Sequence, residues 1–256
     1  MISAAFSFLL LLAPAFGGYV FPDDFQLCRR DDKNLDGCVL SALRDALPKL
    51  AKEGISSPIS LRTEPVYSKY CEYHIRNVDL LYDEYFFNLS HIGLINSTVV
   101  SANADPVNLA LNFTTFSPFM MQIAPYIANG SLLYNGTRDR NPIWGYGIST
   151  KKLYNVTIVH QLKSNQVVKN GETYLEITSY DTSIQMDLIT LDYGNLYNGT
   201  NPELAKDTKD YLNEIAMYLV SDIGGKIEIF FGDMFKTYAN LIFGSVPLNK
   251  IVPDFQ

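Results

Sequence analysis

The chain has 256 residues, of which 47% are apolar and 18% are charged. This composition can fill a hydrophobic core and excludes a wholly disordered protein. The 27 acidic residues outnumber the 20 basic ones, and the resulting net charge of −7 argues against nucleic acids and anionic lipid headgroups as partners.

The first segment has the features of a secretory signal peptide. Residues 1–20 contain no charged side chain, and Ala13-Pro14-Ala15 follows an apolar run in the pattern of a cleavage site. A membrane anchor is less favoured, because the run is shorter than the ~18–20 residues that span a bilayer. We predict a signal peptide over residues 1–17 and one domain over residues 18–256. The product should be secreted and extracellular, with no stable membrane insertion.

Glycosylation sequons support export. Chance predicts about two Asn-x-Ser/Thr sequons in a chain of this composition. The sequence has seven, and we expect N-glycans on their asparagines: Asn88, Asn96, Asn112, Asn129, Asn135, Asn155 and Asn198.

Cys28 and Cys38 are expected to form a disulfide in an oxidising compartment. Metal binding is the competing interpretation, but no histidine or second cysteine pair has the spacing to complete a tetrahedral site. We therefore expect no metal and no cofactor. Cys71 remains, and we expect a buried free thiol there, with an intermolecular disulfide as the alternative.

The first predicted helix covers residues 35–53. It carries an apolar residue at every third or fourth position, namely Leu35, Val39, Leu43, Leu47 and Leu50. Gly54 is expected to end the helix, and Pro48 to bend or shorten its last turn.

From about residue 56 to residue 196 the apolar period changes to two, which predicts long strands. The apolar phase contains Leu109, Leu111 and Phe113, then Val156, Ile158, His160 and Leu162, and then Ile184, Met186 and Leu188. Turns are expected at residues 128–130 and 169–172. Because the connections are too short for helical crossovers, the strands should form an antiparallel meander.

The last quarter returns to the helical period. Asn201-Pro202 has the pattern of an N-cap followed by proline in the first helical position. Continuous from residue 202 to residue 243, the predicted helix would be about 60 Å long. We expect a kink or break at Gly224-Gly225, and Pro247 ends the pattern.

The apolar face of a helix of this length must be buried along its whole length, and a strongly curved antiparallel sheet can bury it. We therefore predict an α+β fold, elongated, with the long C-terminal helix wrapped by the sheet. The seam between them forms an apolar tunnel if side chains do not fill it, and a fully packed core is the open alternative.

Several motifs in order resemble a known family. The matching segments are Phe21-Pro22, Cys28, Cys38 and residues 43–54; then Phe116-Ser117-Pro118, Ala124-Pro125-Tyr126, Gly130, Gly145-Tyr146-Gly147 and residues 169–177; and finally residues 195–199, Glu203-Leu204 and Leu212-Asn213-Glu214. Together they are similar to the takeout and juvenile-hormone-binding-protein family, secreted insect carriers of small lipids. The resemblance covers about residues 19–255.

The resemblance implies a helix wrapped by a sheet around an internal tunnel, and a role in hormone or chemosensory signalling. The sequence departs from the family at the turn in residues 54–58 and at Glu64-Pro65. The second disulfide of the hormone-binding branch has no cysteine pair here, so the takeout branch, with its circadian association, is the more similar.

We expect a small hydrophobic ligand, such as a terpenoid or fatty acid. The tunnel lining is predicted to combine the strand residues Leu109, Leu111, Phe113, Val156, Ile158, His160, Met186 and Leu188 with the helix residues Ile215, Leu219, Ile223, Phe230 and Met234. Plain core packing is the alternative for each of them. His160 shares the apolar phase and is a candidate partner for a polar ligand head, unless backbone groups satisfy it within the core.

Enzyme activity is not expected. The sequence has no Gly-x-Ser-x-Gly elbow, His-Glu-x-x-His helix, phosphate loop or dinucleotide fingerprint. The alternative to a carrier is a secreted glycoprotein that recognises an unknown receptor through its surface and transports no ligand.

Overall fold

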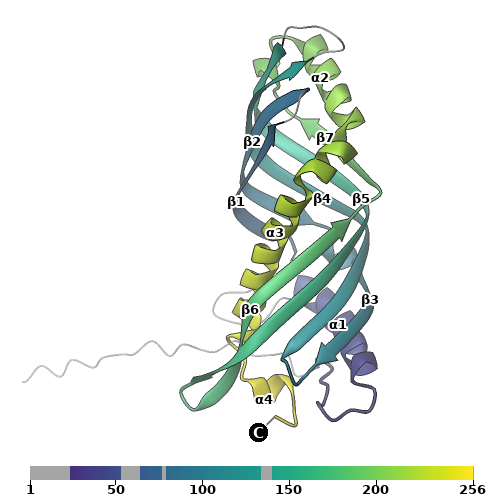
Figure 1. The fold of residues 1–256 in the computed structure, drawn as a ribbon, viewed down its shortest axis with the longest axis vertical. Helices are drawn as coiled ribbons and strands as arrows, with labels where there is room; N and C mark the ends of the chain where they lie inside the picture. The colour runs from purple at the N-terminus through teal and green to yellow at the C-terminus, as the bar shows by residue number, and fades with distance from the viewer. Residues whose placement is uncertain (1–23, 53–63, 77–78, 134–139, 256) are drawn as a thin grey trace, which may run out of the picture.

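The computed structural model describes residues 24–52, 64–76, 79–133 and 140–255. The predicted signal peptide, the predicted helix stop at Gly54 and the sequon at Asn135 lie outside these residues. The described chain is elongated, and an antiparallel sheet of seven strands curls around a long C-terminal helix (Figure 1). The predicted α+β architecture is confirmed.

The seven strands differ greatly in length. They are β1 (Val66–Arg76), β2 (Leu80–Ile92), β3 (Thr98–Asp105), β4 (Ala110–Leu133), β5 (Arg140–Lys169), β6 (Glu172–Gln185) and β7 (Leu188–Tyr193). β5 alone has 30 residues, about 100 Å of extended chain, so it must bend with the sheet.

β4 and β5 pair with each other and run through both halves of the molecule. In the upper half of Figure 1, β2 pairs with the later part of β4, β1 pairs with β2, and β7 pairs with the earlier part of β5. In the lower half, β3 pairs with the start of β4, and β6 pairs with the end of β5. The short strands therefore divide the sheet into two regions that share two long strands.

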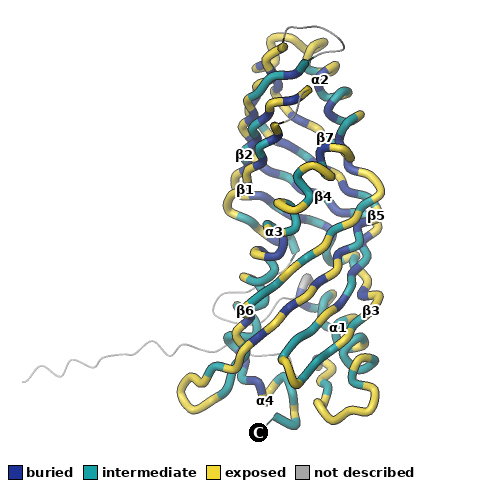
Figure 2. The backbone as a smooth tube through the Cα atoms, viewed as in Figure 1, coloured by how far each residue is buried: buried dark blue, intermediate teal, exposed yellow. Residues whose placement is uncertain are grey.

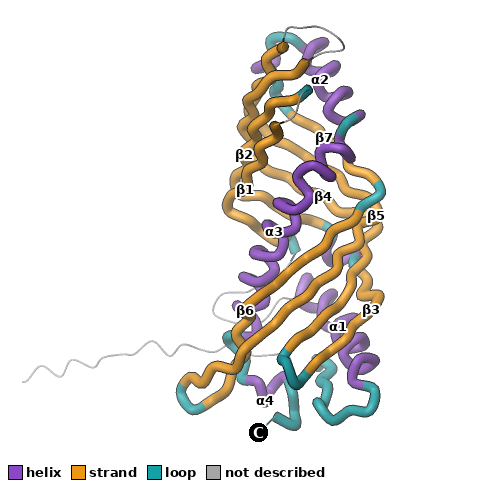
Figure 3. The backbone as a smooth tube through the Cα atoms, viewed as in Figure 1, coloured by secondary structure: helices purple, strands orange, loops and turns teal. Residues whose placement is uncertain are grey.

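The helices are α1 (Leu35–Lys52), α2 (Pro202–Glu214), α3 (Ala216–Phe243) and α4 (Leu248–Ile251), with short 3-10 turns at Leu94–Asn96 and Tyr197–Gly199. Figure 3 shows α3 crossing the strands diagonally through both halves, while α1 lies in the lower half. None of the helices among the described residues combines the length and apolar character that a bilayer span requires.

The break in the C-terminal helix was predicted at the wrong place. α3 runs without interruption through Gly224 and Gly225, and the irregular residue is Ile215, with φ −95° and ψ 4°. The neighbouring Asn213 explains this position, because its side chain hydrogen-bonds both the N–H and the C=O of Leu191 on β7 (2.7 and 2.8 Å). This contact ties the end of α2 to the sheet, whereas packing of α3 on the sheet overrides the low helix propensity of two glycines.

The start of α2 is as predicted. Asn201 is the N-cap, its Oδ1 accepts from the N–H of Leu204 (3.0 Å), and Pro202 occupies the first helical position. α1 begins at Leu35 and continues through Pro48 to Lys52.

One of the two predicted turns is correct. Asn170 and Gly171 connect β5 to β6 with φ values of 53° and 82°, as a two-residue hairpin requires. The turn predicted at residues 128–130 is wrong, because β4 continues through it. Gly130 instead allows β2 to approach β4 closely, because a Cβ at this position would lie 2.1 Å from the carbonyl oxygen of Leu81 on β2.

The alternation predicted for β5 is confirmed, since Val156, Ile158 and His160 are buried while Asn155 is exposed. Figure 2 shows buried and exposed stretches following one another along the long strands. Two other segments differ from the predicted alternation. Leu109 lies in the turn before β4 with φ 50°, rather than in the strand. Met186-Asp187 interrupts the edge between β6 and β7, so the phase shifts and Leu188 is 46% exposed.

Candidate functional site

A cavity of about 410 Å³ lies in the lower half of the molecule, and we call it the lower cavity. Its walls come from α1, the last turns of α3, the strands β4, β5 and β6, and the C-terminal segment. Most lining side chains are apolar, and they include Leu43, Leu47, Leu111, Phe113, Leu162, Ile177, Phe235, Ala239, Phe243 and Val252. Its size and apolar walls fit a flexible small hydrophobic molecule, since ligand cavities range from about 300 to 1,000 Å³.

α1 forms a separate wall over the sheet. Its apolar stripe faces the cavity through residues that include Val39, Leu43 and Leu47. Two polar contacts hold the helix on β3: the Asp36 carboxylate accepts from the N–H of Ala104 (2.8 Å), and the Arg44 Nε–H donates to the carbonyl of Val99 (2.8 Å). These two contacts therefore fix α1 on the sheet through its polar side chains, and its apolar face points toward the cavity.

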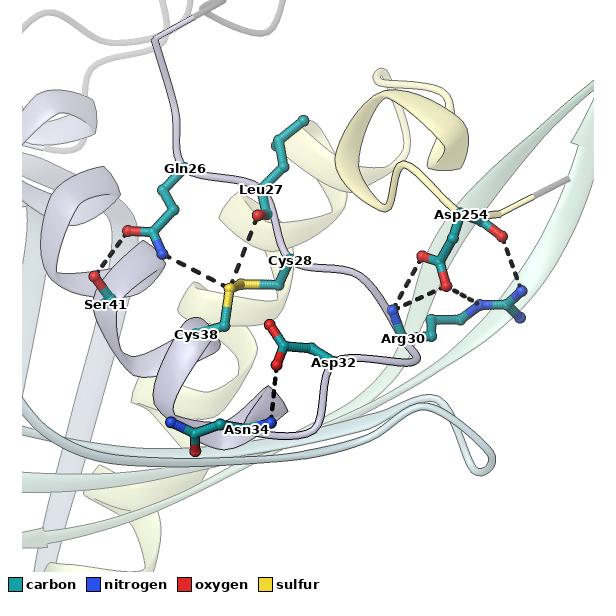
Figure 4. The surroundings of a disulfide bond; sticks show 9 residues. All are labelled: Gln26, Leu27, Cys28, Arg30, Asp32, Asn34, Cys38, Ser41 and Asp254. Carbon is teal, nitrogen blue, oxygen red and sulfur yellow. Dashed lines mark hydrogen bonds and ion pairs between the residues drawn. A yellow bond between two sulfur atoms is a disulfide. The ribbon is translucent and has the colours of Figure 1, made fainter.

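The two ends of the described chain meet at one end of the cavity (Figure 4). The predicted disulfide between Cys28 and Cys38 is present and joins the N-terminal segment to α1. Next to it, the backbone N–H of Arg30 donates to both carboxylate oxygens of Asp254 (3.0 and 3.1 Å). The Arg30 guanidinium lies over the ring of Phe255, 4.9 Å from its centroid. Because Cys28, Arg30 and Phe255 also line the cavity, these contacts hold together the wall at that end.

A buried polar group of three side chains stands in the apolar wall. His160 on β5 has its Nε2 3.0 Å from the Thr115 hydroxyl on β4 and its Nδ1 3.0 Å from the Tyr180 hydroxyl on β6. Its ring stacks on Phe113 at 4.3 Å with an interplanar angle of 6°. All three polar side chains line the cavity, and we call them the His160 triad.

Burial lowers the pKa of His160 to about 3, so the imidazole is neutral at physiological pH. A neutral imidazole has one N–H donor and one acceptor nitrogen. If Nε2 carries the hydrogen, it donates to Thr115 and Nδ1 accepts from Tyr180, which leaves the Thr115 hydrogen unused. The other tautomer leaves the Tyr180 hydrogen unused. Either way, the triad has one O–H donor in excess of its internal hydrogen bonds.

The predicted lining residues fall into three groups. Leu109, Leu111, Phe113 and His160 line the lower cavity. Met186, Leu219 and Ile223 line a second cavity of about 60 Å³ in the upper half, which we call the upper cavity. The others lie elsewhere: Val156, Ile158, Ile215, Phe230 and Met234 pack in core clusters, and Leu188 is largely exposed.

Two aromatic residues on successive turns of α3 lie between the cavities. Phe231 lines the upper cavity and Phe235 the lower one, with ring centroids 5.9 Å apart. These two cavities among the described residues lie along the predicted lengthwise tunnel, and its continuity stays a prediction. Periodicity shows which side chains point inward but not how well they fill the space between them.

Sequence reasoning missed the contributions of α1, Thr115 and Tyr180. The apolar stripe of α1 was predicted, but hydrophobic periodicity does not indicate which part of the molecule the stripe faces. Thr115 lies two residues after Phe113 in the same inward phase, which was the available signal. His160 was expected to be satisfied by backbone groups or by a ligand, and its partners are two side-chain hydroxyls.

The remaining predicted features concern the surface and Cys71. Six sequon asparagines are described, and all six side chains are exposed: Asn88, Asn96, Asn112, Asn129, Asn155 and Asn198. Exposure is necessary for glycosylation, which stays a prediction. Cys71 is a buried free thiol, and burial raises its pKa. Among the described residues, no group of three or more His, Cys, Asp or Glu side chains is placed to hold a metal ion.

Stability should fall in mild acid because two histidines are buried in neutral form. Burial lowers the pKa of His91 to about 4 and that of His160 to about 3, below the ~6.5 of an unfolded histidine. Between these values the unfolded chain binds more protons, so unfolding becomes more favourable as pH falls from 6.5 toward 4. Each histidine should contribute a loss of about 2 kcal/mol between pH 7.5 and pH 5. Urea unfolding at several pH values measures this loss.

The His91→Gln variant should show a shallower pH dependence over the same range. A control is His74, which is partly exposed, and whose pKa is raised by Asp83 and Glu72. Its replacement should not flatten the curve. Equal stability of the unmodified protein at pH 7.5 and pH 5 would contradict the assignment of two neutral buried histidines.

These features define a class of protein: an elongated α+β fold in which a sheet wraps a long helix and encloses an apolar cavity. The sequence model of the family described as haemolymph juvenile hormone binding protein matches residues 6–253, and the chain belongs to this family. The resemblance found in the sequence is confirmed.

A solved structure agrees on the fold. Takeout 1 from Epiphyas postvittana is 18% identical, with a TM-score of 0.68, and the match covers 89% of this chain and 99% of that one. A lipopolysaccharide binding protein is 14% identical over 61% of this chain and 34% of that one, with a TM-score of 0.25, which is too low to support an argument. No curated protein matches the sequence.

Proposed function

We propose that this protein is a secreted carrier that holds one small hydrophobic molecule, such as a terpenoid or fatty acid, in its lower cavity. The observation that carries the proposal is the apolar cavity of about 410 Å³. Membership of a family described as hormone-binding in haemolymph supports the same conclusion. The proposed ligand-binding residues are those that line this cavity, with Leu109, Leu111, Phe113 and His160 among the residues expected from the sequence.

The energetics of such a ligand are favourable. Burying about 300–400 Å² of apolar ligand surface contributes roughly 8–10 kcal/mol before the costs of association. Those costs remove about 3 kcal/mol or more, and a net of about 5–7 kcal/mol corresponds to dissociation constants from roughly 200 μM down to about 10 μM. The cavity thus supplies binding free energy mainly through its apolar walls, while the His160 triad orients the ligand.

Native mass spectrometry of the protein purified from its own source tests the carrier function. A carrier should retain a small apolar molecule that organic extraction releases. Purified apo protein should then take up one equivalent of a fluorescent fatty acid. Protein that carries no molecule and takes up none would contradict the proposal and favour a recognition module acting through its surface.

The His160 triad should select ligands that accept a hydrogen bond. Its one excess O–H can donate to a carbonyl, ester, ether or epoxide oxygen of the ligand. A methyl ester should therefore bind more tightly than an alkane of equal length, by about 5- to 10-fold for one hydrogen bond of about 1 kcal/mol. Isothermal titration calorimetry with the two compounds measures this ratio.

The triple variant Thr115→Val, His160→Leu, Tyr180→Phe removes every hydrogen-bond donor of the triad and should bring the ratio of the two affinities close to one. Tyr174→Phe is the control, because its hydroxyl bonds Glu172 on the same hairpin and Tyr174 does not line the cavity. If the triple variant left the preference for the ester unchanged, the triad would not be the polar partner of the ligand.

A further inference from the structure

The two faces of the sheet differ in the upper half of the molecule. Successive side chains of a strand point to opposite faces. On the inner face, Glu84 of β2 and Lys151 of β5 form a buried ion pair at 3.1 Å. The outer face carries exposed side chains, and six of those on β1, β2, β4 and β5 are large and apolar. We call these six the outer apolar face: Tyr70, Phe87, Ile127, Trp144, Tyr146 and Ile148.

The residues of the outer apolar face are neighbours across the strands. Tyr70 on β1 pairs with Phe87 on β2, and their ring centroids are 5.6 Å apart. Ile127 on β4 pairs with Tyr146 on β5. Contiguous exposed apolar surface of this kind marks a place where another group binds.

Asn129 places a glycosylation sequon in the same face. It begins the sequon Asn129-Gly130-Ser131, and its side chain is exposed on β4 in the same phase as Ile127. The register sets Trp144 of β5 directly opposite. Side chains that face each other across an antiparallel pair begin about 5 Å apart. The first sugar of a glycan on Asn129 would therefore start beside the indole ring.

Trp144 is held in place from within the protein. Its ring meets that of Tyr197 edge to face, with centroids 5.9 Å apart and an interplanar angle of 88°. Tyr197 is itself buried, and its hydroxyl lies 2.8 Å from the Thr208 hydroxyl on α2. Trp144 is nevertheless 38% exposed, so part of its surface is open to a partner. The negative face of an aromatic ring attracts the C–H groups of a sugar, and dispersion adds to the contact.

The other neighbour of Asn129 has a different character. Asp83 on β2 pairs with Asn129 in register, but its carboxylate is bonded to β1. It accepts from His74 Nδ1 (2.6 Å) and from the Arg76 guanidinium. The β2 side of Asn129 is therefore charged, and the β5 side is the one that offers apolar surface to a sugar.

We propose that the outer apolar face is covered by an N-glycan of the chain itself, attached at Asn129. Its innermost sugar, N-acetylglucosamine, packs on Trp144, and the following sugars extend over Tyr146 and Ile127. The covered face is then closed to a second copy of the chain, which would otherwise find a contiguous apolar surface there. This inference shares the export step with the carrier proposal but does not depend on any ligand in the lower cavity.

The test uses the fluorescence of Trp144, which is the only tryptophan of the chain. Glycoprotein secreted from eukaryotic cells should carry a glycan at Asn129, as glycopeptide mass spectrometry reports. Ser131→Ala removes the sequon without changing Asn129, and it should raise the acrylamide quenching constant of Trp144 at least twofold. Ser131→Thr keeps the sequon and should leave the constant unchanged.

A control glycan and an enzymatic experiment separate contact from other effects. Asn112→Gln removes the sequon on β4 in the lower half and should not alter quenching. If Ser131→Ala does not fold, deglycosylation of the folded protein replaces it. Trimming each glycan to its innermost sugar should preserve the protection, and complete removal should abolish it.

Three results would overturn the proposal. The first is an unmodified Asn129 in the secreted protein. The second is a quenching constant that stays the same when the glycan at Asn129 is lost. The third is a glycosylated dimer that Tyr146→Asp dissociates, because it would assign the outer apolar face to a second copy of the chain.

Discussion

Replacing Lys151 with methionine is expected to lower the free energy of unfolding by about 3–5 kcal/mol, because Glu84 would be left as an uncompensated buried charge. Lys151 and Glu84 are 9% and 4% exposed, so solvent cannot take over the role of the missing cation. Adding Glu84→Gln should recover a large part of this loss, since the second substitution removes the stranded charge. Urea denaturation followed by circular dichroism measures both changes.

The exposed pair between Lys206 and Asp210 on α2 is the control. Its side chains are 72% and 62% exposed, and pairs of this kind contribute only about 0.3–0.5 kcal/mol. Lys206→Met should therefore have a small effect. A Lys151→Met variant as stable as Lys206→Met would contradict the role of Lys151 as the cation that compensates a buried Glu84.

Filling the lower cavity is expected to abolish most ligand binding. Ala239→Trp on α3 places a large ring in the space that the ligand would occupy. If the ring displaces about 100 Å² of buried ligand surface, the loss is about 2.5 kcal/mol, or nearly 100-fold in affinity. Displacement of a fluorescent fatty acid measures the change, and thermal unfolding checks that the variant folds.

Ile229→Trp is the matched control for this substitution. Ile229 is also on α3, but it is 68% exposed and does not line either cavity. Its affinity for the fatty acid should stay within about twofold of that of the unmodified protein. Undiminished binding in Ala239→Trp would show that the ligand lies elsewhere, and the carrier proposal would then need another site.

Sequence reasoning succeeded where local chemistry decides the structure. The Asn201-Pro202 start of α2, the disulfide between Cys28 and Cys38 and the Asn170-Gly171 hairpin each follow from a few adjacent or nearby residues. The alternation along β5 also succeeded, because a strand with one buried face has a strict period of two.

Sequence reasoning failed where a contact between residues far apart in the chain decides the local structure. The helix breaks at Ile215 because Asn213 bonds Leu191 on β7, and no local pattern indicates that partner. Gly130 lies in mid-strand because β2 approaches closely, although its immediate sequence is typical of a turn. The lining of the lower cavity was only partly predicted for the same reason, since its second wall is α1, which is far from the sheet residues in the sequence.

The continuous ladder between β4 and β5 has a consequence for how the molecule opens. The first pair is Ala110 with Lys163 and the last is Leu133 with Arg140, and the register is interrupted only at Pro118. The same two strands are therefore hydrogen-bonded to each other in both halves of the molecule. An opening that separates β4 from β5 along their whole length breaks hydrogen bonds in both halves. A guest held at one end therefore slows amide hydrogen exchange at the other, and the occupied protein resists proteolysis along its whole length.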